Sequence, residues 1–157
     1  MTFPLRTFRR GIHPPANKFT KDAPLQEFPT PDKVFISLSQ HIGAPATPTV
    51  AVGDHVDVGQ VIASASGFVS ANVISSVSGT VKAFCTLPTA NGGEATHIEI
   101  ENDHLFTEQR LSALNEPTKE EIIERIKDAG IVGMGGATFP THVKLMPKDP
   151  IDTLIIN

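Results

Sequence analysis

The chain has 157 residues, 39% of them hydrophobic, a formal net charge of −4 and one cysteine, Cys85. This length suits one domain of about 100–150 residues plus a smaller remnant, and no apolar run approaches the roughly 20 residues that cross a bilayer. The acidic balance gives no reason to expect a nucleic-acid partner, because that needs clustered Lys or Arg, and a lone cysteine excludes an internal disulfide or cysteine-held cluster.

Residues 1–32 are predicted to form an extended arm. Prolines are frequent here and few apolar positions recur with a regular period, so the segment can form little core of its own. We expect the arm to lie against another surface. His13, followed by Pro14 and Pro15, could contact a cofactor, although two prolines that stiffen a loop explain the same motif.

Residues 33–102 are predicted to form an all-β domain. Strands so short and so closely spaced favour a small sandwich or barrel. Cys85 lies beside Phe84 in one run, which favours a buried packing role over a reactive thiol. The short β-branched runs, separated by Gly, Pro, Asn and Ser, are 34–38, 49–52, 60–63, 80–84 and 97–100.

The turns of this domain are similar to those of the biotinyl/lipoyl-type barrel-sandwich hybrid. Gly53-Asp54 supplies one turn, and Gly59 permits a positive φ before the next strand. A carrier domain of that type needs a lysine at the hairpin tip between Gly59 and Gly79, and the tip near residues 67–69 has none. We therefore expect no covalent biotin or lipoyl group, and a fold kept as a docking or covering module.

The histidines do not predict a metal site. His41, His55, His97 and His104 show neither an i, i+4 helical pair nor a cysteine partner. His55 is interpreted as a surface residue, because carboxylates beside it in a hairpin shape turns without needing to do acid–base work. No catalytic residue and no metal ligand is assigned.

Residues 103–117 are polar and irregular, which is typical of a linker, and a helix is predicted after them. Thr118 is a good N-cap with Glu121 three residues later, a pattern that predicts a capping box. Apolar residues follow at helical spacing over 122–129. Gly130 is predicted to end the helix in a left-handed conformation.

The next run predicts an anion-binding loop. Gly133, Gly135 and Gly136 lack a Cβ, so backbone N–H groups there can approach a flat or phosphorylated ligand. A helix predicted to begin at Phe139 or Pro140 would add the partial positive charge of its N-terminus. A tight turn packed against a sheet explains the glycines as well, so the glycine pattern alone leaves both interpretations open.

Residues 151–156 form an apolar run that predicts the first part of a buried strand. Because this run stops without a turn, we expect the sequence to be an amino-terminal fragment. The order helix, glycine loop, helix and strand suits the start of an α/β domain over residues 118–157. The predicted fold class is mainly β plus an α/β remnant: a barrel-sandwich hybrid without a carrier lysine, followed by the opening of an α/β domain.

The glycine run resembles a known flavin-binding loop. The string Gly-x-Gly-Gly-Ala-x-Phe-Pro-Thr-x-x-Lys, residues 133–144, is similar to the FMN-binding loop shared by the flavoprotein of respiratory complex I and the RnfC component of the Rnf electron-transport complex. Residues 11–18 and 39–60 resemble the first segments of RnfC, so the resemblance spans nearly the full length. Members of that family continue into a cysteine-rich region with two 4Fe–4S clusters, which this sequence lacks.

The resemblance implies a set of cofactor contacts. Lys144 would offer a cation to the flavin or its phosphate; the alternative is a surface helix lysine. Asn157 would hydrogen-bond FMN from the side, or be simply a strand end. Thr138 stands where complex I has a glycine, so its side chain could keep the backbone further from the flavin at that position. The glycines that would line FMN with backbone atoms are Gly133, Gly135 and Gly136.

By resemblance, the parent protein is the peripheral NADH and FMN component of a membrane complex that moves electrons between NAD and ferredoxin and couples them to ion translocation. It would bind NADH as substrate and lie with other Rnf proteins on the cytoplasmic face of the bacterial inner membrane. The flavin would accept a hydride and pass single electrons to iron–sulfur centres. For this sequence alone we favour a structural or docking module, because half a cofactor site loses most of its convergent polar contacts.

Overall fold

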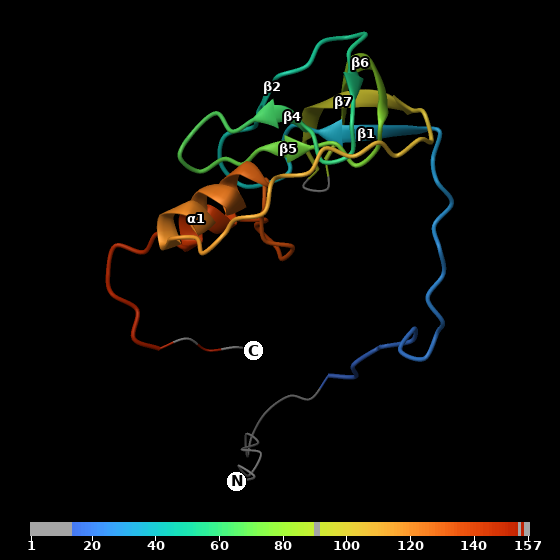
Figure 1. Cartoon of the computed structure of the whole chain (residues 1–157). Helices are drawn as coiled ribbons and strands as arrows, with labels where there is room; N and C mark the ends of the chain where they lie inside the picture. The colour runs from blue at the N-terminus through green and yellow to red at the C-terminus, as the bar shows by residue number, and fades with distance from the viewer. Residues whose placement is uncertain (1–13, 90–91, 154, 156–157) are drawn as a thin grey trace.

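A computed structural model describes residues 14–89, 92–153 and 155 (Figure 1). The predicted fold class, mainly β plus the start of an α/β domain, is confirmed. The described residues contain no helix that is long and apolar enough to cross a membrane. The elements in chain order are β1 (Lys33–Ser37), β2 (Thr47–Pro48), β3 (His55–Val56), β4 (Val61–Ser64), β5 (Val73–Ile74), β6 (Gly79–Pro88), β7 (Glu94–Asn102), α1 (Lys119–Asp128) and α2 (Thr141–Lys144).

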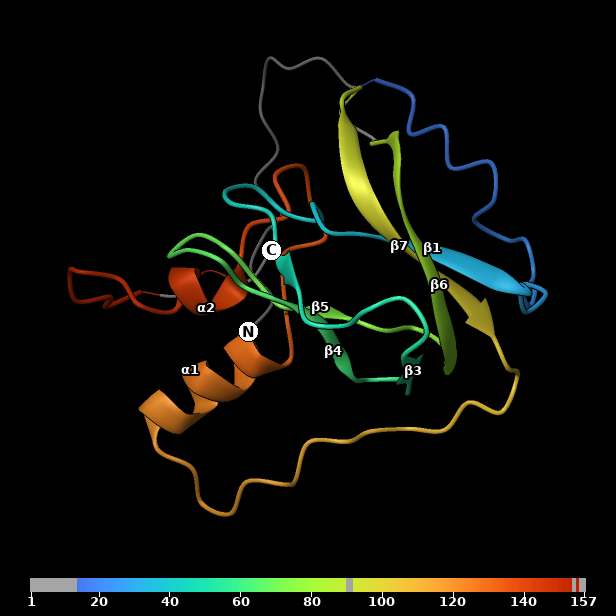
Figure 2. The same cartoon turned by 90° about the horizontal axis from the view of Figure 1, so that it is seen from above.

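Antiparallel pairing arranges the strands in two sheets, which we name the β module. The larger sheet has the strand order β1-β7-β6-β3, and the smaller has the order β2-β4-β5. Figure 2 shows the long strands β6 and β7 curving past the short strands β4 and β5. Side chains from both sheets form one core, which includes Ile36, Val56, Val81, Ile98 and Ile100 from the larger sheet and Ile62, Ala63 and Val73 from the smaller.

The alternation of β7 explains how the larger sheet presents one face to this core. Successive side chains of a strand point to opposite faces, and Ile98 and Ile100 are fully buried. Glu99, between them, points outward and accepts a hydrogen bond of 2.9 Å from the Nζ of Lys33 on the neighbouring strand β1. The core therefore depends on every second residue of β7.

Most predicted strands are confirmed, and one is wrong. The runs at 34–38, 60–63, 80–84 and 97–100 lie in β1, β4, β6 and β7. Residues 49–52 are not a strand: β2 ends at Pro48, and a turn follows. Asp54 accepts a hydrogen bond of 2.8 Å from the N–H of Ala51, and Gly53 has φ +98°. The predicted Gly-Asp turn therefore begins earlier than expected, and its local hydrogen bond outweighs the strand preference of the β-branched residues before it.

The two ends of the described chain behave differently from the β module. Residues 14–32 are exposed and run away from the sheets (Figure 1). The predicted strand at 151–156 is absent from its described residues, 151–153 and 155, while 154 and 156 lie outside the description. A strand needs a neighbour to complete its backbone hydrogen bonds, and no described strand pairs with this segment.

The predicted capping box of α1 is confirmed. The N–H of Glu121 donates to the Thr118 hydroxyl at 3.2 Å, and the Glu121 carboxylate accepts from the N–H of Thr118 at 2.8 Å. Gly130 follows the helix with φ +64°, the predicted left-handed ending. No residue of α1 is buried, and the Ile122 side chain is 43% exposed, so its apolar face is only partly covered.

The end of α1 packs directly against the loop before β5. A Cβ on Gly130 would lie 2.4 Å from the carbonyl oxygen of Asn72, far inside van der Waals contact. The side-chain amide of Asn72 donates to the carbonyl of Asp128 at 3.3 Å. Two residues at the helix end therefore contact one asparagine of the β module, and only a glycine permits this approach.

Two buried histidines lie at the same junction. His41 accepts a hydrogen bond of 3.0 Å from the N–H of Ala71, and its Nδ1 lies 3.0 Å from the carbonyl of Ile42. His142 of α2 is 4% exposed, and its Nδ1 has no hydrogen-bond partner among the described residues. Burial lowers the pKa of His142; nearby Lys127 and His41 lower it further, and Glu124 opposes them.

The contact at Gly130 leads to a stability prediction. Alanine at position 130 should cost about 2–4 kcal/mol, because a left-handed residue with a Cβ costs roughly 1–2 kcal/mol and the methyl group also collides with Asn72. Gly92→Ala is the matched control, since Gly92 has φ +82° and no described atom within 4 Å of its Cβ position. Urea unfolding and hydrogen exchange of the α1 amides measure both losses. Equal losses would contradict the close contact.

The environment of His142 leads to a pH prediction. Its lowered pKa means that the unfolded chain binds a proton at a higher pH than the folded chain does. Stability should therefore be highest above about pH 6.5, the ordinary histidine pKa, and fall as the pH drops below it. His142→Gln should reduce the fall in melting temperature between pH 7 and pH 5. The exposed His104 serves as control, and His104→Gln should leave that fall in place.

Candidate functional site

Residues 131–140, the glycine loop, close on themselves through backbone hydrogen bonds. The N–H of Gly133 donates to the carbonyl of Phe139 at 2.9 Å, and the N–H of Thr138 donates to Gly135 at 2.9 Å. At the base, the N–H of Thr141 donates to Ile131 at 3.0 Å. The loop is therefore a defined structure with two internal bonds, and not an open connection.

One side of this loop is open. No described atom lies within 4 Å of the Cβ positions of Gly135 and Gly136, and both residues are exposed. No hydrogen bond within the described chain uses the backbone N–H groups of Gly135, Gly136 or Ala137. Exposed backbone donors that are free to bind, on a surface without side chains, are what an anion-binding loop requires.

Lys144 lies beside the first glycine of the loop. A Cβ on Gly133 would be 3.3 Å from the Lys144 Nζ, and this Nζ lies 5.8 Å from the centre of the Phe139 ring. None of the ion pairs among the described residues involves Lys144, which is exposed. The structure thus brings together Gly133 and Lys144, eleven positions apart in the sequence, and leaves the cation available to a ligand.

The helix after the loop begins one or two residues later than predicted, and it is short. The sequence predicts a start at Phe139 or Pro140, whereas α2 begins at Thr141 and has only four residues. Pro147 explains its early end, because the residue before a proline avoids the helical region. A single turn adds little dipole, so the loop amides and Lys144 carry the positive character of this region.

Thr138 occupies a left-handed backbone position, with φ +44°. A β-branched residue is strained in this region, whereas glycine adopts it freely. This conformation gives a physical reason for a glycine at the corresponding place in complex I. The N–H of Thr138 donates to the carbonyl of Gly135 within the loop, so this N–H is not available to a ligand.

A cavity of about 530 Å³ separates the glycine loop from the β module. Gly136, Ala137 and Thr138 form one wall, and the segment after β1 and the ends of β6 and β7 form the other. The N–H of Ile42 donates to the carbonyl of Ala137 at 3.2 Å and joins the two walls. No motif marks this cavity in the sequence, because its walls come from distant segments that only the fold brings together.

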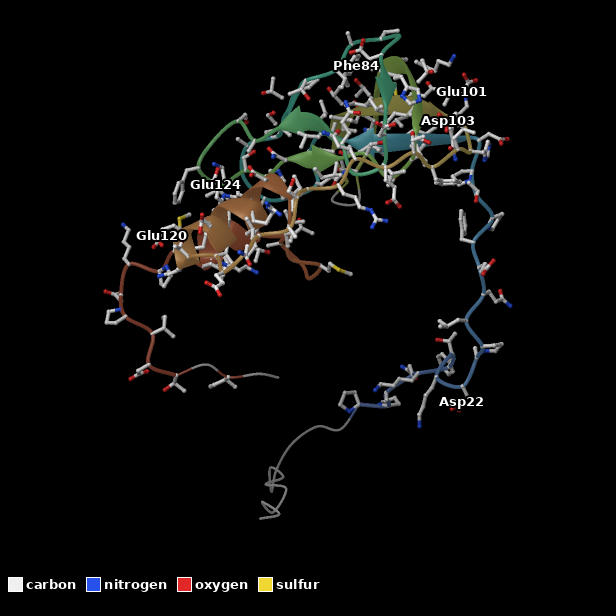
Figure 3. The ribbon with its side chains drawn as sticks, viewed as in Figure 1. Asp22, Phe84, Glu101, Asp103, Glu120 and Glu124 are labelled. Atoms are coloured by element: carbon white, nitrogen blue, oxygen red, sulfur yellow. The ribbon has the colours of Figure 1, made fainter. Side chains whose placement is uncertain are left out.

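The hydrogen-bonded group around His55 has a structural role. Asp103 accepts hydrogen bonds from Ser78 (2.6 Å) and from the N–H of Leu105 (2.9 Å), and His55 Nε2 lies 3.0 Å away. These contacts lower the pKa of Asp103 to about 2. Figure 3 shows Asp103 near Glu101, at the other end of the molecule from α1. A carboxylate held ionised in this way joins strands and is poorly suited to proton transfer at neutral pH.

Three other sequence predictions have separate outcomes. His13 and Asn157, the candidate cofactor contacts at the two ends, lie outside the described residues. Cys85 is only half-buried, with its Sγ 3.9 Å from the carbonyl of His97. Within the part of the chain that the structure describes, no three His, Cys, Asp or Glu residues are arranged to hold a metal ion.

Comparison with protein families assigns both parts of the chain. Residues 6–105 match the family described as the RnfC barrel sandwich hybrid domain. Residues 126–157 match the Nuo51 FMN-binding domain. The first match contains the whole β module, and the second contains the glycine loop and α2.

Individual relatives agree with these matches. The C subunit of the proton-translocating ferredoxin:NAD(+) oxidoreductase complex of Clostridium ljungdahlii is 44% identical over 98% of this chain and 35% of the relative. The Na(+)-translocating counterpart of Acetobacterium woodii is 43% identical over 96% of this chain and 36% of the relative. The corresponding protein of the ion-translocating oxidoreductase complex of Pseudomonas aeruginosa is 42% identical over 98% of this chain and 21% of the relative.

The chain thus spans between a fifth and just over a third of the length of these relatives. The RnfC barrel sandwich hybrid domain alone matches residues 6–105, well over half of the chain and all of the β module. The chain belongs to the RnfC family.

Proposed function

We propose that this chain is part of the peripheral NADH and FMN electron-transfer protein of an ion-translocating ferredoxin:NAD oxidoreductase complex, and that its glycine loop binds FMN. The observation that carries the proposal is the open side of the loop, where the N–H groups of Gly135, Gly136 and Ala137 have no partner among the described residues and Lys144 is close by. The match of this segment to an FMN-binding domain supports the same assignment.

The residues of the loop fit FMN in charge and in shape. Gly133, Gly135 and Gly136 would face the cofactor with backbone atoms, and Lys144 would pair with its phosphate or with the flavin. When bound, FMN would accept a hydride and release single electrons. The chain itself would orient the ring and neutralise the phosphate. Asn157 would complete the set with a side-chain hydrogen bond.

The remaining parts of the assignment belong to the complete protein. Residues 33–102 would form one domain and residues 118–157 the start of the FMN and NADH domain, joined by 103–117. Two 4Fe–4S clusters would lie in a further cysteine-rich region and receive the electrons. Other Rnf proteins would hold this one on the cytoplasmic face of the bacterial inner membrane.

A docking role without redox activity is the second candidate, and one observation favours it. The β module has a closed core of its own, with residues such as Ile62 and Ile98 fully buried, whereas the glycine loop offers a ligand only one open side. In this alternative, the chain positions partner proteins of the complex and leaves cofactor binding to other segments.

The flavin proposal predicts a charge effect at Lys144. Lys144→Ala should weaken FMN binding at least about tenfold, because a hydrogen bond to a charged group contributes roughly 1.5–3 kcal/mol. FMN fluorescence during titration of the flavin-free complete protein, and of this chain alone, measures the Kd. Lys148→Ala, which removes an exposed lysine four residues away, should leave the Kd unchanged. Failure of the complete protein to bind FMN would leave the docking alternative.

The strained backbone of Thr138 predicts a stabilising substitution. Thr138→Gly should raise stability by about 0.5–1 kcal/mol, since the relief of left-handed strain exceeds the extra entropy that glycine loses on folding. Thr141→Gly, in the helical turn α2, should instead lower it by about 1 kcal/mol. Thermal unfolding distinguishes the two. A lower melting temperature for Thr138→Gly would mean that the threonine side chain contributes more than its backbone strain costs.

A further inference from the structure

We propose that the β module forms the second wall of the nucleotide site, and that the cavity between it and the glycine loop binds a neutral, hydroxyl-rich part of the ligand. That chemistry belongs to the ribityl chain of a flavin and to the ribose of a nicotinamide dinucleotide. The inference rests on the proposed function of the glycine loop and extends it to residues of the β module.

The cavity is formed before any ligand binds. His41 accepts from Ala71 and donates from Nδ1 to the carbonyl of Ile42, which holds the segment after β1 in place. The N–H of Ile42 then donates to the carbonyl of Ala137 in the glycine loop. Because both walls are joined by these bonds, a ligand would meet an existing surface and would not have to order one.

His97 of β7 supplies a hydrogen-bond acceptor to this cavity. Its Nδ1 lies 2.9 Å from the carbonyl oxygen of Ala95, and a carbonyl only accepts, so the Nδ1 carries the proton. In this tautomer Nε2 keeps a lone pair, and it has no hydrogen-bond partner among the described residues. The side chain is 8% exposed and lines the cavity. An unpaired acceptor that faces the cavity in this way suits a ligand hydroxyl.

Hydroxyl groups on the same wall complement the histidine. Ser37 accepts a hydrogen bond of 3.1 Å from the N–H of Ser39, which leaves its own proton available to donate. Thr89 donates to Gly93 at 3.2 Å, which leaves its oxygen lone pairs available to accept. One donor and two acceptors on a single wall suit a chain or ring that carries several hydroxyl groups.

The wall that the β module contributes to the cavity favours a neutral occupant over the phosphate. No Lys, Arg, Asp or Glu is among the described residues that line the cavity, and the loop residues Gly136 and Ala137 bring their amides to its opposite side. Lys144 lies beside Gly133, outside this lining. The ligand would therefore lie across the cavity, with its anionic end toward Lys144 and the amides of the glycine loop, and its sugar-like part against His97 and Ser37 on the opposite wall.

The test compares ligands that share one part and lack the other. The flavin-free complete protein is titrated with FMN and with riboflavin, which keeps the ribityl chain but has no phosphate, and the FMN-loaded protein is titrated with NADH. His97→Ala and Ser37→Ala should each weaken either both flavins or NADH by about three- to tenfold, the effect of losing one hydrogen bond. An effect on both flavins identifies the ribityl chain, and an effect on NADH alone identifies the ribose.

Lys144→Ala separates this inference from the proposed function. With the anionic end at Lys144, as proposed here, it should weaken FMN but not riboflavin, because riboflavin has no phosphate; equal weakening of both would place Lys144 on the flavin ring and overturn this arrangement of the ligand. His104→Ala, which removes an exposed histidine just after the end of β7, is the control and should change nothing. If Lys144→Ala weakens FMN while His97→Ala and Ser37→Ala leave all three ligands within twofold of the unaltered protein, the cavity proposal is overturned and the loop assignment stands. If FMN does not bind the unaltered protein, both are overturned.

Discussion

The contact between the end of α1 and the β module determines the position of the candidate site. Gly130 approaches Asn72 so closely that no side chain fits between them, and Ile42 donates a hydrogen bond to Ala137 on the other side of the glycine loop. The loop is therefore anchored at two places by a domain that contributes none of the glycines. Every distance in the site depends on this anchoring.

The β module explains why such an anchor is possible. Its two sheets bury a common core that includes Ile62, Ile98 and Ile100, so its surface loops are held on a rigid support. The loop between β4 and β5 folds back toward the segment after β1, where the N–H of Ala44 donates to Val69 at 3.0 Å. The hairpin that would display a carrier lysine in a biotinyl or lipoyl domain thus helps instead to hold the neighbouring segments (Figure 2).

Charge and polarity are divided between two adjoining surfaces. The open side of the loop presents exposed amides and Lys144, which suit an anion. The wall of the cavity on the β module presents hydroxyl and imidazole groups and no Lys, Arg, Asp or Glu among its described residues. A nucleotide has the same two parts, a phosphate and a sugar-like chain. The β module could therefore help to bind the proposed cofactor without taking part in its chemistry.

The sequence alone determined the features that depend on neighbouring residues: the capping box of Thr118 and Glu121, the left-handed Gly130, four of the five predicted strands and the glycine loop with its resemblance to a flavin site. It failed at residues 49–52, where a turn replaced the predicted strand, and it placed the start of α2 at residue 139 or 140 instead of Thr141. Only the tertiary structure placed Lys144 beside Gly133 and brought His97 and Ala137 to one cavity. Those contacts join segments that are far apart along the chain. Hydrophobic periodicity and turn motifs report only on neighbouring residues, so they do not predict such contacts.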